Sequence, residues 1–306
     1  MSTAPPALDF FWAELTGRCQ LACTHCYAGS GPTGTHGSMT LPDWISAITQ
    51  SRRLGARMVQ FIGGEPTLHP HLTDLISHAL DVGLEVEVYS NLVSIRPVMW
   101  EVFGQSGVRL ATSYYTDDPE QHQRITGRGV LHRTRDNIAR AVVTGIPIRV
   151  GIVGVLDGQR IDHAKQQLTA LGVADVNVDR MRLLGRPART ACDASELCGK
   201  CGDGIAAILP DGSVTPCPLS RWLRAGDIRD TGLPSLVGDA RRLARERILP
   251  AITAGSRPCE PSCNPGCDPG VNAPGGGDGC MPKSRCDPNQ PPDKPCKPST
   301  TCGPKR

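Results

Sequence analysis

Three cysteines near the start of the chain constrain its structure more than any other feature. Cys19, Cys23 and Cys26 stand in a C-x3-C-x2-C spacing within one short stretch. Thiolates this close in sequence can hold three corners of a four-iron cube. The fourth iron then lacks a protein ligand, and an open coordination position is typical of a metal centre that binds a small molecule. The spacing therefore predicts a reactive iron–sulfur site.

Zinc binding and disulfide formation are the alternatives for this stretch. Cys19, Cys23, His25 and Cys26 are all residue types that bind zinc, so a zinc site stays open. A disulfide is disfavoured, because the N-terminus lacks the basic region and the apolar stretch of a secretory signal. In a reducing compartment, most of the 14 cysteines are expected to be metal ligands or catalytic groups.

Charge and hydropathy exclude two classes of partner. The net charge is +3, and basic residues are scattered among acidic ones, which argues against nucleic acid binding. No run of about 20 apolar residues is present, so no segment is expected to cross a membrane. The sequence predicts a cytoplasmic protein that binds neither nucleic acid nor membrane.

Apolar runs alternate with amphipathic stretches along the first 180 residues. Strands are expected over 8–15, 58–62, 84–89, 108–113, 146–156 and 175–179. Helices are expected over 40–54, 70–82, 96–103, 119–144 with a break at 126–129, and 161–171. Six strands separated by helices predict an α/β fold with parallel βαβ units. An open doubly wound sheet and a curved partial barrel both fit, and both bind ligands at the carboxyl ends of the strands.

A Gly63-Gly64-Glu65-Pro66 tetrad follows the second expected strand. Its two glycines allow the backbone to approach a ligand closely, and Glu65 can accept a hydrogen bond from an ammonium group. Taken alone, the tetrad would more often be an ordinary turn. Its place at the end of a strand puts it beside the cysteine loop.

Together, C-x3-C-x2-C and GGEP resemble the radical S-adenosylmethionine (radical SAM) superfamily. The resemblance implies a partial (β/α)6 barrel in which Cys19, Cys23 and Cys26 hold a [4Fe-4S] cluster. It also implies that Gly63, Gly64 and Glu65 position SAM. Reductive cleavage of SAM would give a 5′-deoxyadenosyl radical that abstracts a substrate hydrogen, and flavodoxin or ferredoxin would donate the electron.

Several polar residues at later strand ends are further candidates for SAM contacts. The resemblance points to Ser90, Asn91, Ser113, Arg182 and Tyr27. Arg180 and Arg186 are expected with Arg182 to meet the SAM carboxylate or an anionic substrate. Loop caps, a solvated basic loop and ordinary core packing are the structural alternatives for these residues.

Cysteines return in the second half of the chain. Cys201 and Cys217 flank an expected hairpin with a strand over 205–209 and an Asp211-Gly212 turn. Their C-x10-G-x4-C pattern resembles the SPASM and twitch extensions of radical SAM enzymes, which hold auxiliary [4Fe-4S] clusters. Cys201 and Cys217 are thus expected ligands of an auxiliary cluster. Further candidates are Cys259, Cys263 and Cys198.

The last 50 residues hold 7 cysteines and 12 prolines, a composition that cannot form a regular core. Their cysteine spacing departs from the SPASM pattern, which leaves the number of auxiliary clusters open. The chain is expected to comprise a radical SAM core over 1–187, a SPASM/twitch-like auxiliary cluster domain with the hairpin over 188–267, and a Pro/Gly/Cys-rich tail over 268–306. The tail is expected to be disordered, to bind zinc or to hold a redox thiol. An Arg-rich helix over 238–249 is expected to be solvated.

The resemblance favours an enzyme that matures a ribosomally synthesised peptide by a crosslink, a thioether or an epimerisation. The alternative is a radical SAM dehydrogenase, epimerase or decarboxylase acting on a sugar, aminoglycoside or nucleoside. A non-catalytic zinc or redox module is the third reading. No leader-binding segment precedes the first expected strand, so a separate leader-peptide-binding protein is a further expected partner.

Overall fold

The computed structural model describes residues 7–188 and 193–254. Nine strands form one sheet: β1 (Phe10–Glu14), β2 (Met58–Ile62), β3 (Glu85–Tyr89), β4 (Val108–Tyr114), β5 (Ile148–Gly154), β6 (Asp175–Arg180), β7 (Ile205–Ile208), β8 (Ser213–Thr215) and β9 (Gly226–Asp227). The helices are α1 (Leu41–Arg53), α2 (Leu72–Asp81), α3 (Pro97–Phe103), α4 (Pro119–Thr126), α5 (Leu131–Val143), α6 (Ile161–Ala170), α7 (Leu233–Arg247) and α8 (Leu249–Ala254). Three short 3-10 helices join them: η1 (Pro66–Leu68), η2 (Ala194–Glu196) and η3 (Pro218–Ser220).

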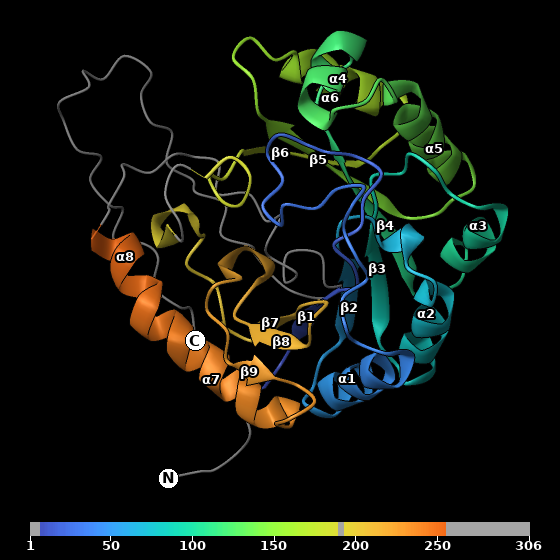
Figure 1. Cartoon of the computed structure of the whole chain (residues 1–306). Helices are drawn as coiled ribbons and strands as arrows, with labels where there is room; N and C mark the ends of the chain where they lie inside the picture. Colours follow the sequence, from blue (N-terminus) through green and yellow to red (C-terminus); the bar gives the residue numbers. More distant parts are fainter. Residues whose placement is uncertain (1–6, 189–192, 255–306) are drawn as a thin grey trace, which may run out of the picture.

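The strand order β6-β5-β4-β3-β2-β1-β7-β8-β9 confirms the expected partial barrel. Strands β1 to β6 pair in parallel and in sequence order, each joined to the next through at least one helix. Helices α1 to α6 lie along the outer, convex side of this curved sheet (Figure 1). All six expected core strands and the helices between them are present, because each has a local apolar pattern and its own start signal.

The first helix shows how local sequence sets these boundaries. Thr40 and Asp43 form a capping box at the start of α1, and Pro42 occupies its first turn. Trp44, Ala47 and Ile48 then point to the sheet and are fully buried. Capping thus begins the helix, and burial of its apolar face fixes the helix against the strands.

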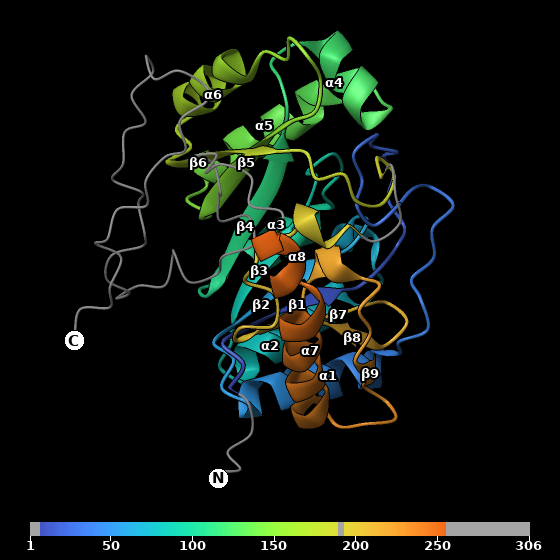
Figure 2. The same ribbon diagram turned by 90° about the vertical axis from the view of Figure 1, so that its left-hand side faces the viewer.

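The hairpin formed by β7 and β8 continues the core sheet. Strand β7 pairs in parallel with β1, while β8 and β9 add antiparallel strands beyond it. Helix α7 packs through Leu233, Leu236 and Val237 into the same apolar core as β1. In Figure 2 it lies in front of the part of the sheet that holds β1 and β7. The division into a core, a cluster module and a tail stays a prediction.

The two faces of the core strands differ in character. Outward residues such as Phe11, Phe61 and Val88 are fully buried under the helices. Inward residues include Gln60, Glu87 and Arg149, so the concave side carries polar groups. This alternation, with a period of two residues, makes the inside of the barrel suitable for a ligand.

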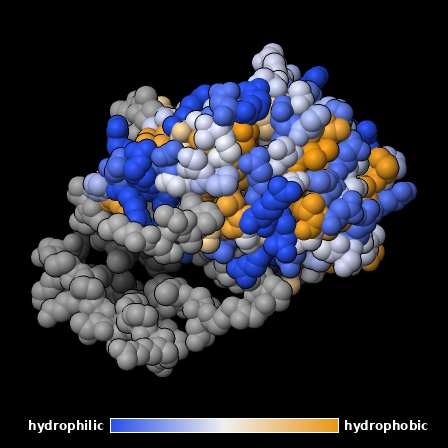
Figure 3. All heavy atoms as spheres, turned by 90° about the horizontal axis from the view of Figure 1, so that it is seen from below, coloured by the Kyte–Doolittle hydropathy of each residue, from blue (hydrophilic) through white to orange (hydrophobic). Residues whose placement is uncertain are grey.

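No helix in the described ranges is both long and apolar enough to cross a bilayer. Seen from below, the hydrophobic side chains form separate spots among hydrophilic ones (Figure 3).

Candidate active site

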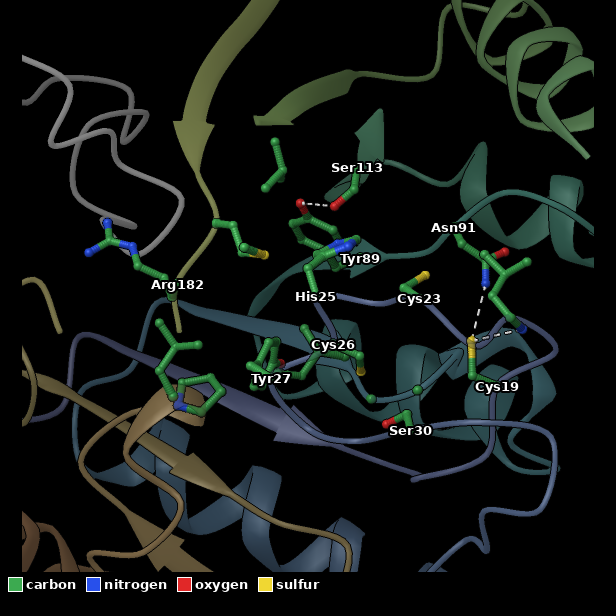
Figure 4. A pocket seen from close by; sticks show the side chains of 18 of the residues that line it. Cys19, Cys23, His25, Cys26, Tyr27, Ser30, Tyr89, Asn91, Ser113 and Arg182 are labelled. Carbon is green, nitrogen blue, oxygen red and sulfur yellow. Dashed lines mark hydrogen bonds between the residues drawn. The ribbon is translucent and has the colours of Figure 1, made fainter. Parts of the chain in front are cut away.

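A cavity of about 280 Å³ opens inside the barrel, lined by residues from each of β1 to β6. The cluster loop, defined as residues 19–27, forms one wall. Pro218 and Leu219 of η3 come from the second half of the chain. In Figure 4 the three cysteine side chains lie on one side of the pocket and Arg182 lies on the opposite side. The pocket therefore has a thiol wall, formed by the cluster loop, and a far wall on the opposite side, formed by residues of β6, the segment after it and η3.

The three predicted cysteines share this wall. The Sγ atom of Cys19 accepts hydrogen bonds from Leu21 N at 3.4 Å and from Asn91 Nδ2 at 3.6 Å. Burial raises the pKa of Cys19 to about 12 and that of Cys23 to about 11. Both thiols therefore stay protonated at neutral pH until a metal displaces the proton.

A lone zinc ion is a poor fit to this wall. A zinc ion with zinc–sulfur bonds of about 2.3 Å needs its thiolates arranged tetrahedrally around it, within about 4 Å of one another. Across residues 7–188 and 193–254, no three Cys, His, Asp or Glu side chains gather in a way that could hold a single ion. A four-iron cluster takes thiolates set farther apart than one ion does, so the donor set suits a cluster.

Arg186 holds the cluster loop from outside the pocket. Its guanidinium donates to the carbonyl oxygens of Ser30 at 2.8 Å, Gly29 at 3.2 Å and Cys23. Its backbone N–H donates to Cys26 O at 3.0 Å. Arg186 is not among the residues that line the pocket, so these contacts make it a clamp on the loop, and its expected role toward an anion stays a prediction.

Gly185 makes this clamp possible. A Cβ atom at this position would lie 2.0 Å from Tyr27 O, and the backbone has a φ of +67°. Only glycine accepts both the contact and the left-handed conformation without strain.

The GGEP tetrad packs on the segment that enters the cluster loop. Gly64 N donates to Thr16 O at 2.6 Å, and Glu65 N donates to Arg18 O at 2.8 Å. A Cβ on Gly64 would lie 2.4 Å from Arg18 O. Gly63 and Gly64 line the pocket as expected, and their lack of side chains also permits this backbone contact.

The side chain of Glu65 lies behind the pocket wall. It is fully buried, and its Oε1 accepts hydrogen bonds from Thr67 N at 3.1 Å, Thr67 Oγ1 at 2.7 Å and Ser90 Oγ at 2.8 Å. Its Oε2 accepts from Asn91 N at 2.8 Å. Burial raises the pKa of Glu65, opposed by these hydrogen bonds. Neither Glu65 nor Ser90 lines the pocket, so both position Asn91, and their predicted contact with SAM stays a prediction.

Replacing Glu65 with alanine is expected to lower the free energy of unfolding by about 3 kcal/mol. The change leaves buried donors of Thr67, Ser90 and Asn91 without an acceptor, at about 1–3 kcal/mol for each unsatisfied group. Denaturant unfolding of the metal-free protein measures the loss. The exposed residue Glu101 offers a matched control. Equal stability of Glu65→Ala and Glu101→Ala would contradict the account.

Of the other expected contact residues, five reach the pocket: Tyr27, Asn91, Ser113, Arg180 and Arg182. The Ser113 hydroxyl lies 3.0 Å from the Tyr89 hydroxyl. Arg182 donates to Glu196 O at 2.9 Å and lies 3.6 Å from Asp179 Oδ1. These contacts hold the side chains of Ser113 and Arg182 in place before any ligand binds.

Sequence reasoning missed the inward residues of the strands, among them Trp12, Gln60, Tyr89 and Asp179, and also Tyr115, which directly follows β4. The signal was available, because Trp12 and Gln60 alternate with the buried outward residues Phe11 and Phe61.

Two polar atoms of the pocket wall lack a partner among the described residues. His25 Nδ1 and Ser30 Oγ are both buried without a hydrogen bond. Burial lowers the pKa of His25 to about 4, so its imidazole is neutral at pH 7. Unpaired buried polar atoms are costly in a finished core, and in a pocket they suit a polar ligand.

Charged side chains lie under the pocket on neighbouring strands. The Glu87 carboxylate accepts from Arg149 Nη2 at 2.7 Å and lies 2.9 Å from Arg109 Nε. The Arg149 guanidinium lies 5.5 Å from the ring centre of Tyr89. Through Tyr89 this buried network supports the pocket wall at Ser113.

The second cysteine group forms next to the same pocket. Cys201 Sγ lies 3.1 Å from Cys217 Sγ, and both residues are buried. Hydrogen bonding by Cys198 and then by Cys217 raises the pKa of Cys201, which indicates that Cys198 is also a neighbour of Cys201. Cys217 directly precedes the pocket residues Pro218 and Leu219. Cys259 and Cys263 lie outside the described residues.

Comparisons with known proteins show what the chain is similar to. The model of the radical SAM superfamily matches residues 13–166, half of the chain. The PqqA peptide cyclase of Streptomyces rochei is 32% identical over 172 residues, which are 56% of this chain and 46% of that protein. Its counterpart in Xanthomonas oryzae is 32% identical over 159 residues, 50% of this chain and 41% of the relative. The chain thus spans less than half the length of these curated relatives.

Solved structures share the fold. Streptococcus suis SuiB bound to the precursor peptide SuiA has a TM-score of 0.64 at 13% identity, covering 77% of this chain and 67% of SuiB. The structure of anSMEcpe with bound AdoMet has a TM-score of 0.61 at 13% identity, covering 81% and 84%. The family model matches half of the chain, and the strand order and the pocket wall that holds both the cysteines and the glycines agree with that match. The chain therefore belongs to the radical SAM superfamily.

Proposed function

We propose that this protein is a radical SAM enzyme that matures a ribosomally synthesised peptide. The observation that carries the proposal is the pocket itself, which places Cys19, Cys23 and Cys26 on one wall and leaves a second wall for a substrate. The curated relatives are named peptide cyclases, and SuiB was solved with its precursor peptide, which supports a peptide substrate here.

Each part of the pocket has a proposed role. The three cysteines hold the [4Fe-4S] cluster, and Gly63, Gly64 and Asn91 shape the space beside it for SAM. When bound, the cluster and SAM supply the 5′-deoxyadenosyl radical by reductive cleavage. Trp12, Tyr27 and Tyr115 line the cavity and exclude water, which protects a radical from side reactions.

The far wall suits a substrate with both polar and apolar groups. Arg182 and Asp179 supply charge, while Leu219 and Pro218 supply apolar surface. Cys198, Cys201 and Cys217 lie next to this wall, where an auxiliary cluster would be close enough to take an electron from the substrate radical. Cys259 and Cys263 stay candidates for its remaining ligands.

Anaerobic co-expression with candidate precursor peptides tests the proposal. Short open reading frames beside the gene provide the peptides, and mass spectrometry reads the product. A crosslink or thioether is expected as a peptide lighter by a pair of hydrogen atoms, and an epimerised residue is expected to take up solvent deuterium. The Cys26→Ala enzyme is the control and is expected to leave the peptide unchanged. An altered sugar, aminoglycoside or nucleoside with no altered peptide would favour the alternative predicted from the sequence.

Reduction of the cluster requires a partner. A one-electron donor of the flavodoxin or ferredoxin type fits this need, and a separate leader-peptide-binding protein stays a further predicted partner. The cytoplasmic location also stays a prediction.

A further inference from the structure

Charge is distributed unevenly around the outer side of the cluster loop. The segment that contains the loop, residues 15–42, and two segments beside it, residues 91–100 and 121–135, together contain six arginines and no aspartate or glutamate, and Glu101, Glu120 and Asp136 directly adjoin the last two. The whole chain is nearly balanced, with 33 basic and 30 acidic residues. A local excess of this kind creates a positive field over the loop.

Contacts show that these segments adjoin the loop. Ala22 N donates to Thr126 O at 3.1 Å, and Thr24 N donates to Ile125 O at 2.9 Å. Leu21 and Val93 pack with Cys19, and Cys23 and Val130 pack against the same small cluster. Val93 and Val130 belong to the segments that carry the arginines, so these segments pack directly against the thiol residues.

Five of these arginines are exposed, and four of the five lie outside the segment that contains the loop: Arg96, Arg124, Arg128 and Arg133. We call this set the outer basic face. None of them forms an ion pair with any residue that the structure describes, in contrast to Arg135, which pairs with Asp136 at 2.9 Å. The nearest acids on α4 and its start are engaged or one turn away: Asp117 pairs with Arg160, Asp118 caps the helix, and Glu120 lies in its first turn.

We propose that the outer basic face is the docking site of an acidic one-electron carrier, a reduced flavodoxin or ferredoxin. The inference rests on the proposed function and adds the surface through which the cluster receives its electron. A carrier needs close approach to the cluster without blocking the substrate. The outer basic face meets both needs, because it lies over the loop's outer side while the substrate wall is formed by β6 and η3.

One electron leaves the carrier and one enters the cluster. A flavin hydroquinone in the carrier becomes a semiquinone, or a reduced ferredoxin cluster becomes oxidised. The oxidised [4Fe-4S] cluster of the enzyme becomes reduced by the same single electron. No bond forms between the two proteins, so attraction between opposite charges is enough to set the encounter rate.

Two reductants separate docking from chemistry. SAM cleavage by the holoenzyme is measured as 5′-deoxyadenosine formed, either with dithionite or with limiting acidic flavodoxin kept reduced by NADPH and its reductase. Arg124→Glu with Arg128→Glu is expected to slow the flavodoxin-driven rate at low salt by about tenfold or more. The dithionite-driven rate is expected to stay within about twofold of the wild type, since dithionite needs no docking site.

Arg53→Glu with Arg57→Glu provides a matched control. Both residues are exposed and precede β2, at the opposite end of the strands from the loop, and the charge change is the same. Both rates are expected to match the wild type. The second expected result concerns the wild type. Its flavodoxin-driven rate is expected to fall several-fold as the salt concentration rises, because salt screens the attraction between the two proteins.

Several outcomes would overturn the proposal. One is a charge-reversed pair that keeps the full flavodoxin-driven rate. If the Arg124→Glu, Arg128→Glu variant loses its iron, the test is the salt dependence of the wild type. A flavodoxin-driven rate that does not change with salt concentration then overturns the proposal. Loss of peptide product with an unchanged flavodoxin-driven rate would assign the face to an acidic substrate peptide instead. A wild type that cleaves SAM with flavodoxin but modifies no peptide would contradict only the proposed function.

Discussion

Replacing Cys23 with alanine is expected to abolish reductive cleavage of SAM and to remove about four iron atoms from each chain. The thiol belongs to the wall that faces the cavity, beside Cys19 and Cys26. A cluster that already leaves one iron without a protein ligand cannot stay bound through two thiolates. The measurements are iron content after anaerobic reconstitution and 5′-deoxyadenosine formed with dithionite.

Thr24→Ser is the matched control for this change. Thr24 is exposed and adjacent to Cys23, and serine keeps the hydroxyl that donates to Ile125 O. Iron content and SAM cleavage are expected to match the wild type. Full cleavage by Cys23→Ala would show that the cluster is held elsewhere.

Replacing Cys217 with alanine is expected to separate SAM cleavage from product formation. Its Sγ lies 3.1 Å from that of Cys201, and both belong to the hairpin end rather than to the thiol wall. SAM cleavage with dithionite is expected to persist, while peptide product falls by roughly 100-fold or more, since even a lost outer-shell contact of a metal site costs about 10- to 100-fold in activity. Rates of 5′-deoxyadenosine and of product, measured in the same reaction, provide the comparison.

Cys201→Ala is expected to behave like Cys217→Ala, because the two thiols touch. Ser235→Ala removes a polar atom from an exposed position in the first turn of α7 and serves as the control. Normal product yield from Cys217→Ala would leave the second cysteine group without a role in the reaction.

Local patterns predicted most of the barrel. A capping box marked the start of α1, and short apolar runs marked each strand, since both signals lie within one stretch of chain. The start of α7 was missed because Leu233 and Pro234 precede the Arg-rich pattern, and Pro234 occupies the first helical turn.

Long-range contacts were beyond reach. Nothing in the residues around Ile205 indicates that β7 pairs with β1, because the segment between these two strands contains almost all of the barrel. The motif glutamate Glu65 gave no sign that its carboxylate would be buried against Ser90 and Asn91. Nor did any residue pattern indicate that Arg186 would donate hydrogen bonds to the carbonyl oxygens of Cys23 and Ser30. Such partners are set by tertiary packing, not by propensity.

Iron counting tests the central claim that two separate cysteine groups each hold a cluster. The comparison is between the anaerobically reconstituted wild type and a variant in which Cys19, Cys23 and Cys26 are all alanine. The wild type is expected to hold about eight irons or more, and the variant about four fewer, with no cleavage of SAM. Zinc in place of iron, or equal iron in the two proteins, would contradict the account.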